Sequence, residues 1–495
     1  MPPTADRALD SDASVLRGMS WMTLNTIGAR LVTFGAQILL GWILLPEDFG
    51  LYALALSVSN AVSAIRNGGS HLLLVRHGDR YDEFASPLTQ YAFVLNFAAF
   101  GILLLAAPAF AHHFGSTDIG WLIVCIGLSI PVGTVANTYR CKLAIDGRFR
   151  ELAMLSMAST VLWQLQTVVM ALAGCGPYSY VVPMICQGLL EGVLGYWYVK
   201  QWPMTRQWIG WRRVVELLRE TRWVMLGAAM LSLALSGHYF IVGLFHDAHV
   251  VGLFFFAYQI VQTATMVLNN SVEAVLPAIL AKLNAQREQQ SGAALGTLAL
   301  LMIVSLPLSG ALAVSAPSLI HWLWNGKWDE SARAVSLLAF CIPCWMVIAV
   351  VRAVLEARGS WRNRFRLLAV YGFGGIGSAA LGAWWGDLQS IAICVTAFYL
   401  VFSLALVAWI PRFLSLELDR LRRALLGPVV AFALCLIATF LGSHWLVEHG
   451  WASYRNLVEI ATFAAASLAV NAIFFRDTWR NALGTVLGRP QRQPG

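Results

Sequence analysis

Two arginines, Arg30 and Arg66, stand within long apolar stretches, where a positive charge is rare. Each stretch exceeds the ~20 apolar residues that an α-helix needs to cross a bilayer. An arginine near the middle of such a helix costs about 3 kcal/mol or more unless it faces protein or water. Counted from the same membrane side, the two lie roughly 18 and 14 Å deep, at a rise of ~1.5 Å per residue. The residues therefore predict an anion-binding site inside a membrane protein.

Other polar residues share a helix face with each arginine, because they recur at spacings of three and four residues. The two stripes consist of Thr23, Thr26, Arg30, Thr33 and Gln37, and of Ser59, Ser63, Arg66 and Ser70. We interpret them as the lining of a cationic, water-filled cavity. Its predicted substrate-binding residues are Arg30, Arg66, Thr26, Thr33, Gln37, Ser59 and Ser63. The alternative is that each arginine binds helix-end carbonyls or pairs with a buried acid.

A third polar stripe ends in a carboxylate. It consists of Tyr258, Gln262, Thr265, Asn269 and Glu273. We assign Asn269 to the same cavity. Glu273 and Glu191 are candidate ion-coupling residues, which bind a cation, relay a proton or pair with an arginine of the cavity. The alternative is that both side chains extend towards the inner membrane surface.

The composition settles the class of protein. Hydrophobic residues make up 58% and charged residues 12% of the 495 residues, and the mean hydropathy is +0.66. A soluble protein of this length would carry about twice that charged fraction. We therefore predict an all-α, polytopic membrane protein with about 14 transmembrane helices in two six-helix bundles plus two C-terminal helices. Prolines within these spans, Pro131, Pro277, Pro307 and Pro343, are candidate kinks.

Two sequence pairs indicate that the bundles are repeats of one another. Trp21 and Trp223 are separated by the same number of residues as Gly50 and Gly252. An even number of spans lies between the copies, which predicts a parallel repeat. The predicted parts are a tail (1–18), a bundle (19–199), an amphipathic linker on the lipid headgroups (200–222), a second bundle (223–410), two further spans (411–475) and a tail (476–495).

Positive charge is concentrated in the segments that lie on one side of the membrane. When the two tails and every second loop are counted, they hold 29 of the 34 lysines and arginines. Cytoplasmic loops carry such an excess, so both termini should lie in the cytoplasm. The net charge of +8 therefore reflects orientation and contact with the lipid bilayer, and we predict no nucleic-acid partner.

Other motifs predict no cofactor and no metal. Cys341 and Cys344 have the spacing of a redox pair but lie in an apolar span, where small packing residues are the simpler reading. Histidine, cysteine and acidic residues nowhere show metal-ligand spacing, and there is no phosphate-binding loop for ATP.

The start of the chain resembles a known family. Leu16-Arg17-Gly18 with Trp21, and the turn from Leu44 to Ala53 containing Pro46-Glu47-Asp48-Phe49-Gly50, are similar to the first segment of polysaccharide-export flippases. These are the O-antigen and exopolysaccharide repeat-unit flippases of the multidrug/oligosaccharidyl-lipid/polysaccharide exporter superfamily. The local resemblance covers residues 14–75, and the span count and the two halves extend it.

The resemblance implies a transporter, not an enzyme, located in the bacterial cytoplasmic (inner) membrane. It implies that an undecaprenyl-pyrophosphate-linked oligosaccharide crosses the membrane by alternating access, and that a polysaccharide polymerase and a chain-length regulator are partners. Pyrophosphate suits bidentate arginines. Two alternatives remain open. They are a drug/cation antiporter of the same superfamily, which would favour buried acids, and a membrane polymerase or ligase, which would need a larger exterior loop.

Overall fold

The structure is a computed structural model that describes residues 28–62, 69–76, 80–205, 207–283 and 286–414, together with 427–430, 432–433, 435 and 437. These residues form helices and connecting turns, and they include no strand. The predicted all-α class is confirmed. Nearly all of the two predicted C-terminal spans and both tails lie outside the described residues.

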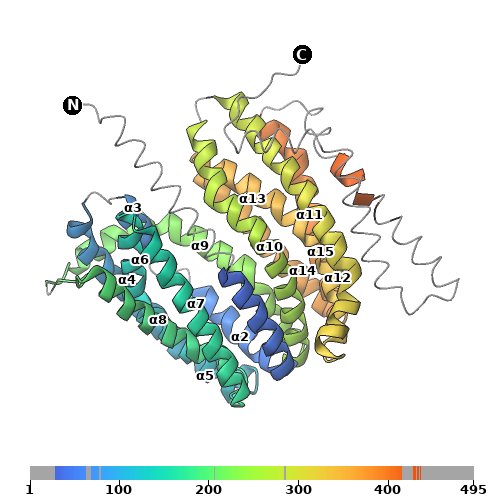
Figure 1. The fold of residues 1–495 in the computed structure, drawn as a ribbon, viewed down its shortest axis with the longest axis horizontal. Coiled ribbons are helices and arrows are strands. Elements are labelled where there is room, and N and C mark those ends of the chain that lie inside the picture. Colours follow the sequence, from blue (N-terminus) through green and yellow to red (C-terminus); the bar gives the residue numbers. More distant parts are fainter. Residues whose placement is uncertain are drawn as a thin grey trace. The chain divides into compact units, whose positions relative to one another are not determined.

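The chain divides into two compact units, one ending at Gly252 and the other beginning at Leu253. The helices of the first unit are Gly28–Ile43, α2 (Pro46–Val62), α3 (Ser70–Arg76), α4 (Tyr81–His113), α5 (Thr117–Val132), α6 (Thr134–Ile145), α7 (Phe149–Leu172), α8 (Tyr178–Val199) and α9 (Trp211–Phe245). Those that follow are α10 (Ala248–Lys282), α11 (Arg287–Trp324), α12 (Asp329–Leu338), α13 (Cys341–Ala357), α14 (Trp361–Trp385) and α15 (Leu388–Leu414) (Figure 1).

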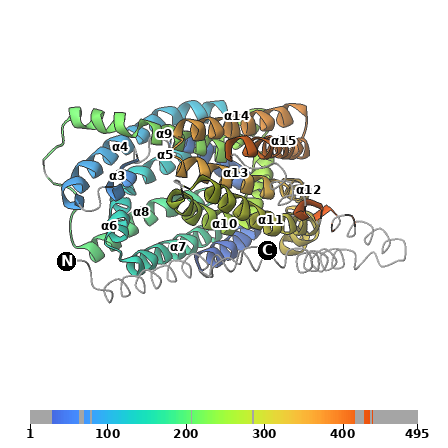
Figure 2. The same cartoon turned by 90° about the horizontal axis from the view of Figure 1, so that it is seen from above.

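The predicted spans from 88–112 to 389–410 each coincide with a helix or with a bent pair of helices. Within a unit, helices that follow one another along the chain pack side by side, such as α14 and α15 (Figures 1 and 2). In the part of the chain that the structure describes, six helices are long and apolar enough to cross a membrane, or up to eight when each bent pair is one span. The predicted number of fourteen stays a prediction.

Two spans are broken, one in each unit. The break between α5 and α6 at Gly133 bends the chain by 41°, and the break between α12 and α13 bends it by 43°. Pro131 and Pro343 lie next to these breaks, where each lacks the N–H that an unbroken helix would use. By contrast, α10 and α11 continue through Pro277 and Pro307. Breaks thus lie beside two of the four prolines, and kinks at Pro277 and Pro307 stay a prediction.

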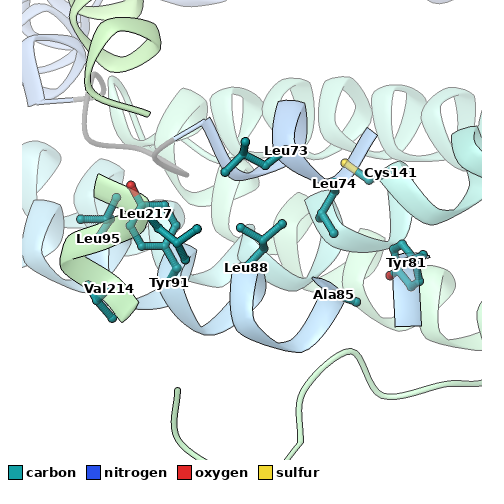
Figure 3. Packing of buried hydrophobic residues seen from close by; sticks show 10 residues of the cluster. All are labelled: Leu73, Leu74, Tyr81, Ala85, Leu88, Tyr91, Leu95, Cys141, Val214 and Leu217. Carbon is teal, nitrogen blue, oxygen red and sulfur yellow. The ribbon is translucent and has the colours of Figure 1, made fainter. Parts of the chain in front are cut away.

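The first turns of α9 pack on protein. Val214 and Leu217 join a buried cluster with side chains of α3, α4 and α6, including Leu74, Leu88 and Tyr91 (Figure 3). Val214 and Leu217 therefore face α3 and α4, while Trp211, Val215 and Leu218 of the same segment are exposed. The predicted placement of the segment on lipid headgroups stays a prediction. Residues 211–222 are also continuous with the span that follows, because α9 runs without a break.

The segment before α9 is tied to the start of α4. Gln90 donates to the carbonyl of Gln207 (2.9 Å) and accepts from the backbone N–H of Ile209 (3.1 Å). Ser86 accepts from the backbone N–H of Thr205 at 2.8 Å. These bonds give backbone groups of the loop fixed partners, so the connection from α8 to α9 has a defined path on the first unit.

The first turns of α2 and α10 meet through two glycines, in a contact whose residues all belong to the first unit. A methyl group on Gly50 would overlap the carbonyl oxygen of Ala248, and one on Gly252 would overlap that of Pro46. Beside them, Glu47 contacts His249 Nδ1 at 2.7 Å, although the two residues are 202 positions apart. The contact is reciprocal, because Gly50 of α2 meets the first residue of α10, and Gly252 of α10 meets the first residue of α2.

Hydrogen bonds in this contact favour the charged form of Glu47. Partial burial alone would raise the pKa of this carboxyl. The bonds that it accepts from its own backbone N–H and from His249 together outweigh burial and lower its pKa from the usual value. Glu47 is therefore an anion that can pair with His249 whenever the imidazole is protonated.

We expect Gly50→Ala and Gly252→Ala each to lower the free energy of unfolding by about 1–3 kcal/mol, because the added methyl group forces the two backbones apart. Thermal unfolding of the purified protein in detergent measures this as a lower Tm. Gly101→Ala is the matched control, since nothing lies within 4 Å of a methyl group added at this position of α4. It should leave Tm unchanged or raise it. A Tm of the Gly50 variant equal to that of the control would contradict the close contact.

Candidate functional site

The polar stripe of the helix Gly28–Ile43 faces α7. Thr33 donates to the carbonyl of Ala29 (2.8 Å) and accepts from Gln164 of α7 (3.3 Å). Gly28, one turn before, lies against Met157 of α7. Arg30 lies on this stripe and is partly buried, as is Gln37. Thr33 of the predicted stripe therefore contacts α7, and the cavity itself stays a prediction.

α7 carries buried polar groups of its own. Ser159, Gln164 and Thr167 are buried. Ser159 and Thr167 donate within their own helix, to the carbonyls of Ser156 and Trp163. Such back-bonding satisfies a hydroxyl without a partner on another helix. Gln164, in contrast, reaches across to Thr33 and joins the two helices.

The other predicted cavity residues are only partly described. Arg66, Ser63 and Thr26 lie outside the described residues. Ser59 is buried in α2 and donates to the carbonyl of Ala55 at 2.8 Å. Its hydroxyl is thus occupied within its own helix, and the residue lies among packed side chains.

On the third stripe, the middle positions are described and the end is not. Thr265 is buried and donates to the carbonyl of Val261 at 2.7 Å. Asn269 is partly buried, and its side-chain oxygen has no hydrogen-bond partner within the described parts of the chain. An amide oxygen in that condition can accept a hydrogen bond from a substrate hydroxyl. The side chain of Glu273 is outside the described part of the structure.

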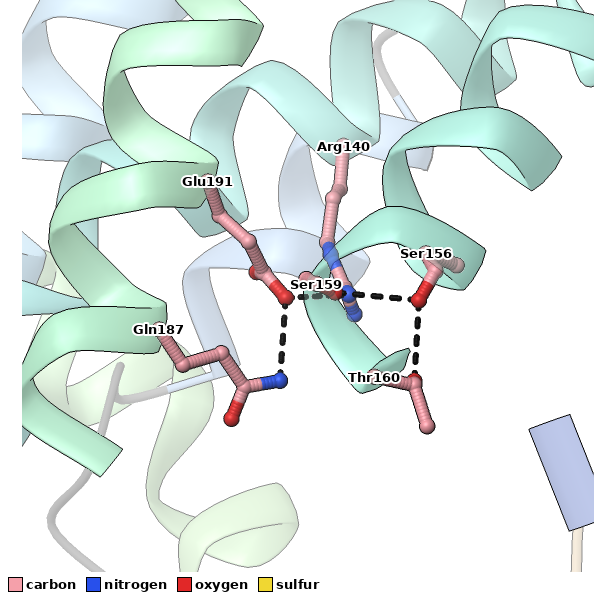
Figure 4. A network of polar contacts seen from close by, with 6 residues as sticks. All are labelled: Arg140, Ser156, Ser159, Thr160, Gln187 and Glu191. Atoms are coloured by element: carbon pink, nitrogen blue, oxygen red, sulfur yellow. Dashed lines mark hydrogen bonds and ion pairs between the residues drawn. The ribbon is translucent and has the colours of Figure 1, made fainter. Parts of the chain in front are cut away.

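Glu191 does pair with an arginine, but with one that sequence reasoning did not choose. Arg140 of α6 donates through Nη2 to Glu191 Oε1 of α8 at 2.7 Å (Figure 4). Gln187, one turn earlier on α8, donates to the same oxygen at 3.2 Å. The Glu191 side chain is 10% exposed and that of Arg140 is 37% exposed. The carboxylate is thus buried, while part of the guanidinium stays accessible.

The bend at Gly133 gives α6 a direction of its own and places it against α8. α7 completes the surroundings with Ser156, Ser159 and Thr160, whose contacts with one another Figure 4 shows beside the ion pair. Ser159 and Thr160 both donate to the carbonyl of Ser156. A guanidinium with spare donors beside a buried carboxylate can bind an anion, and the carboxylate can bind a cation.

Sequence reasoning counted Arg140 among the cytoplasmic charges, because it lies within two turns of the end of α6. The signal that identifies it is a repeat. Arg140 precedes Gly147 by the same seven positions that separate Arg352 from Gly359. Arg150 and Arg362 recur in the same way but are exposed, so partial burial is what separates Arg140 and Arg352 from the charges of the loops.

The described residues contain no group of three or more histidine, cysteine or acidic side chains that could hold a metal ion. Cys341 and Cys344 are buried, free thiols that contact Thr396 Oγ1 and the carbonyl of Phe340. Both behave as small packing residues, in agreement with the simpler reading of their spacing.

Comparison with known proteins identifies the family. Residues 39–333 match the family described as "Polysaccharide biosynthesis protein". The chain belongs to this family. It is 21% identical over 381 residues to the succinoglycan biosynthesis transport protein ExoT of Rhizobium meliloti (strain 1021), covering 77% of this chain and 73% of the relative. It is 22% identical over 426 residues to the teichuronic acid biosynthesis protein TuaB of Bacillus subtilis (strain 168), covering 84% and 83%.

Solved structures share the fold. The lipid II flippase MurJ, in an inward closed conformation, matches with a TM-score of 0.70 and 11% identity, over 92% of this chain and 99% of that protein. An inward-facing multidrug resistance transporter of the MATE family, in the MOP superfamily, matches with a TM-score of 0.63 and 14% identity, over 78% and 94%. The polytopic helical fold of this polysaccharide biosynthesis protein is therefore confirmed, and it resembles the fold of these two transporters.

The ion pair of Arg140 and Glu191 should be coupled energetically. In a double-mutant cycle of Arg140→Gln and Glu191→Gln, we expect a coupling energy of about 0.5–3 kcal/mol from thermal unfolding, because the carboxylate is withdrawn from water. The exposed pair Arg80 and Glu83, with both side chains 62% exposed, is the matched control, and about 0.2–1 kcal/mol is expected there. Equal coupling in the two cycles would mean that burial adds nothing to the Arg140 pair.

Proposed function

We propose that this protein is a flippase that moves undecaprenyl-pyrophosphate-linked oligosaccharide repeat units across the bacterial cytoplasmic membrane for polysaccharide biosynthesis. It acts as a transporter and not as an enzyme. Three observations support the proposal. They are the family membership, the relatives named for succinoglycan transport and teichuronic acid biosynthesis, and the fold shared with a lipid II flippase.

One observation about the site carries the mechanism. Arg30 lies partly buried on the polar face of an otherwise apolar helix, next to the Thr33–Gln164 contact with α7. A pyrophosphate group carries at least two negative charges, and a guanidinium binds phosphate oxygens in a bidentate manner. In the proposed cavity, Arg30 and Arg66 bind the pyrophosphate, while Thr26, Thr33, Gln37, Ser63 and Asn269 contact the headgroup or its sugars. Ser59 is left out because it is buried and bonded within α2. Glu191 and Glu273 are the proposed ion-coupling residues.

The proposed arrangement in the membrane follows from charge. Both termini and the basic loops lie in the cytoplasm, and two six-helix bundles, 19–199 and 223–410, alternate in opening the cavity to either side. The substrate is then passed to a polysaccharide polymerase with its chain-length regulator. A drug/cation antiporter is the second candidate, because the fold also matches a MATE transporter and Glu191 is a buried acid.

Arg30→Ala and Arg66→Ala should each abolish polymer export, because a pyrophosphate loses its main counter-charge in the cavity. Arg30→Lys should restore little, since lysine offers a point charge without the planar fork. The measurement is the leaflet location of lipid-linked oligosaccharide in cells that lack the wild-type gene and carry one of the variants. In cells with either alanine variant, complete repeat units should accumulate on the inner leaflet.

Arg333→Ala is the control, since this arginine is exposed on α12 and has no place in the proposed cavity. It should support normal export. Accumulation on the outer leaflet would mean that translocation succeeds, and would point to a polymerase or ligase. Full export from both cavity variants, at normal membrane abundance, would remove Arg30 and Arg66 from the mechanism.

The topology makes a separate prediction. A reporter fused at Lys327 should report a position outside the cytoplasm, and one fused at Arg212 a position inside it, because the segment around Arg212 is rich in arginine and the segment around Lys327 is not. Alkaline phosphatase and a fluorescent protein provide the two readouts. Reversed activities at either position would overturn the assigned orientation.

A further inference from the structure

The two halves of the chain repeat the same helix end in atomic detail. After α6, the backbone N–H groups of Gly147, Arg148, Phe149 and Leu152 donate to the carbonyls of Ala144, Leu143, Gly147 and Arg148. After α13, the N–H groups of Gly359, Ser360, Trp361 and Arg364 donate to the carbonyls of Glu356, Leu355, Gly359 and Ser360. Each donor and acceptor in the first half corresponds to a donor and acceptor 212 positions later in the chain. The two glycines share a positive φ, of 67° and 64°.

This correspondence makes Arg140 and Arg352 equivalent residues. Each lies two turns before the glycine, on the segment that follows a break in its span, and each is partly buried in its own unit. Arg150 and Arg362 correspond in the same way, but both are exposed, whereas Arg140 and Arg352 are partly buried. Arg140 is further distinguished by its contact with a buried carboxylate.

The acid that pairs with Arg140 is not repeated. α7 and α14 end at Leu172 and Trp385, and α8 and α15 begin at Tyr178 and Leu388. If the two helix ends are aligned, Glu191 corresponds to Leu404, and if the two helix starts are aligned, it corresponds to Val401. None of the residues in that range can carry a charge. The carboxylate is thus a feature of the first unit alone, added to a cation that both units have.

The geometry of the pair leaves Arg140 with donors to spare. Only Nη2 bonds Glu191, and Nε is buried without a hydrogen-bond partner in the described structure. A buried, unsatisfied N–H is unfavourable, and an oxygen atom of a bound anion would relieve it. The side chain is 37% exposed, so an anion can reach it. Gln187 donates to the same carboxylate oxygen, so Glu191 keeps one hydrogen bond when Arg140 turns to an anion.

We propose that Arg140 binds the phosphate groups of the transported lipid and that Glu191 is a built-in competitor, which occupies the guanidinium until phosphate displaces it. The inference rests on the proposed function, because it takes the anion to be the diphosphate of a lipid-linked substrate. Two negative groups cannot both hold one guanidinium at full strength, so the resting ion pair lowers affinity and favours release after transport. A diphosphate, with more charge and more acceptors, wins over a single carboxylate.

The test is binding by the full-length protein in nanodiscs of phosphatidylcholine. The probe is a long-chain isoprenyl pyrophosphate, titrated by thermal shift. Glu191→Gln keeps the shape of the side chain and removes the competing charge, and it should tighten binding about 10-fold. Arg140→Gln should weaken binding about 10-fold, and the double variant should show no gain from the Glu191 change. Arg333→Gln is the control and should bind as wild type.

Two further arms identify the ligand chemistry. Inorganic pyrophosphate should compete with the isoprenyl probe in the wild type and in Glu191→Gln, as expected for headgroup recognition. Phosphatidylglycerol should not compete, and equal competition by it would overturn the assignment in favour of a general anionic-lipid contact. Gln187→Leu, which frees Glu191 without touching either charge, should also alter the affinity for the probe, and provides a second variant if Arg140→Gln fails to fold.

Failure of the inference and failure of the function are distinguishable. Wild-type protein that binds no isoprenyl pyrophosphate would contradict the proposed function as well as the inference. Wild-type protein that binds the probe, with affinities of Glu191→Gln and Arg140→Gln unchanged, would overturn the competitor alone.

Discussion

Charge inside apolar helices is the constraint on which the rest of this structure depends. A guanidinium or a carboxylate surrounded by lipid-facing side chains is stable only when another part of the protein supplies its partner. The Arg140–Glu191 pair meets this requirement by joining α6 to α8, and Gln187 adds a donor from the same helix. The bend at Gly133, which gives α6 its separate direction, is therefore part of the same solution. The hydrogen bond from Gln164 to Thr33 likewise gives polar side chains a partner between α7 and the helix Gly28–Ile43.

The positions of the helices could be predicted from the sequence, because a bilayer imposes a length and an apolar composition on each span. The prolines indicated where spans could break, although only Pro131 and Pro343 lie at breaks. The path of the loop before α9 could not be predicted. Its backbone is held by Ser86 and Gln90, more than 100 positions earlier in the chain, and nothing in the local sequence of the loop identifies those partners. The amphipathic start of α9 was visible, but whether lipid or protein covers its apolar face is decided by tertiary packing.

Some residues of the candidate site could likewise be identified from the sequence, and others could not. Arg30 and Glu191 were found because a charge in an apolar stretch is conspicuous by itself. Arg140 was missed because its position near a helix end resembles that of an ordinary cytoplasmic charge, and only a partner on another helix distinguishes it. Sequence reasoning allowed Glu191 a partner among Arg30 and Arg66, whereas the structure gives it the arginine one helix away in space. Pairings of this kind depend on helix rotation and bending, which periodicity alone does not fix.

The reciprocal contact of Gly50 and Gly252 brings equivalent positions of the predicted repeat together in one chain. In a pair of identical subunits related by a two-fold axis, each residue on the axis meets its own copy, so charged neighbours there would repel. Joining two copies in one polypeptide removes that restriction, since the equivalent positions become separate codons. Glu47 and His249 occupy such equivalent positions and now contact one another as acid and base. In one polypeptide the contact can therefore be complementary in charge while both glycines keep the two backbones close together.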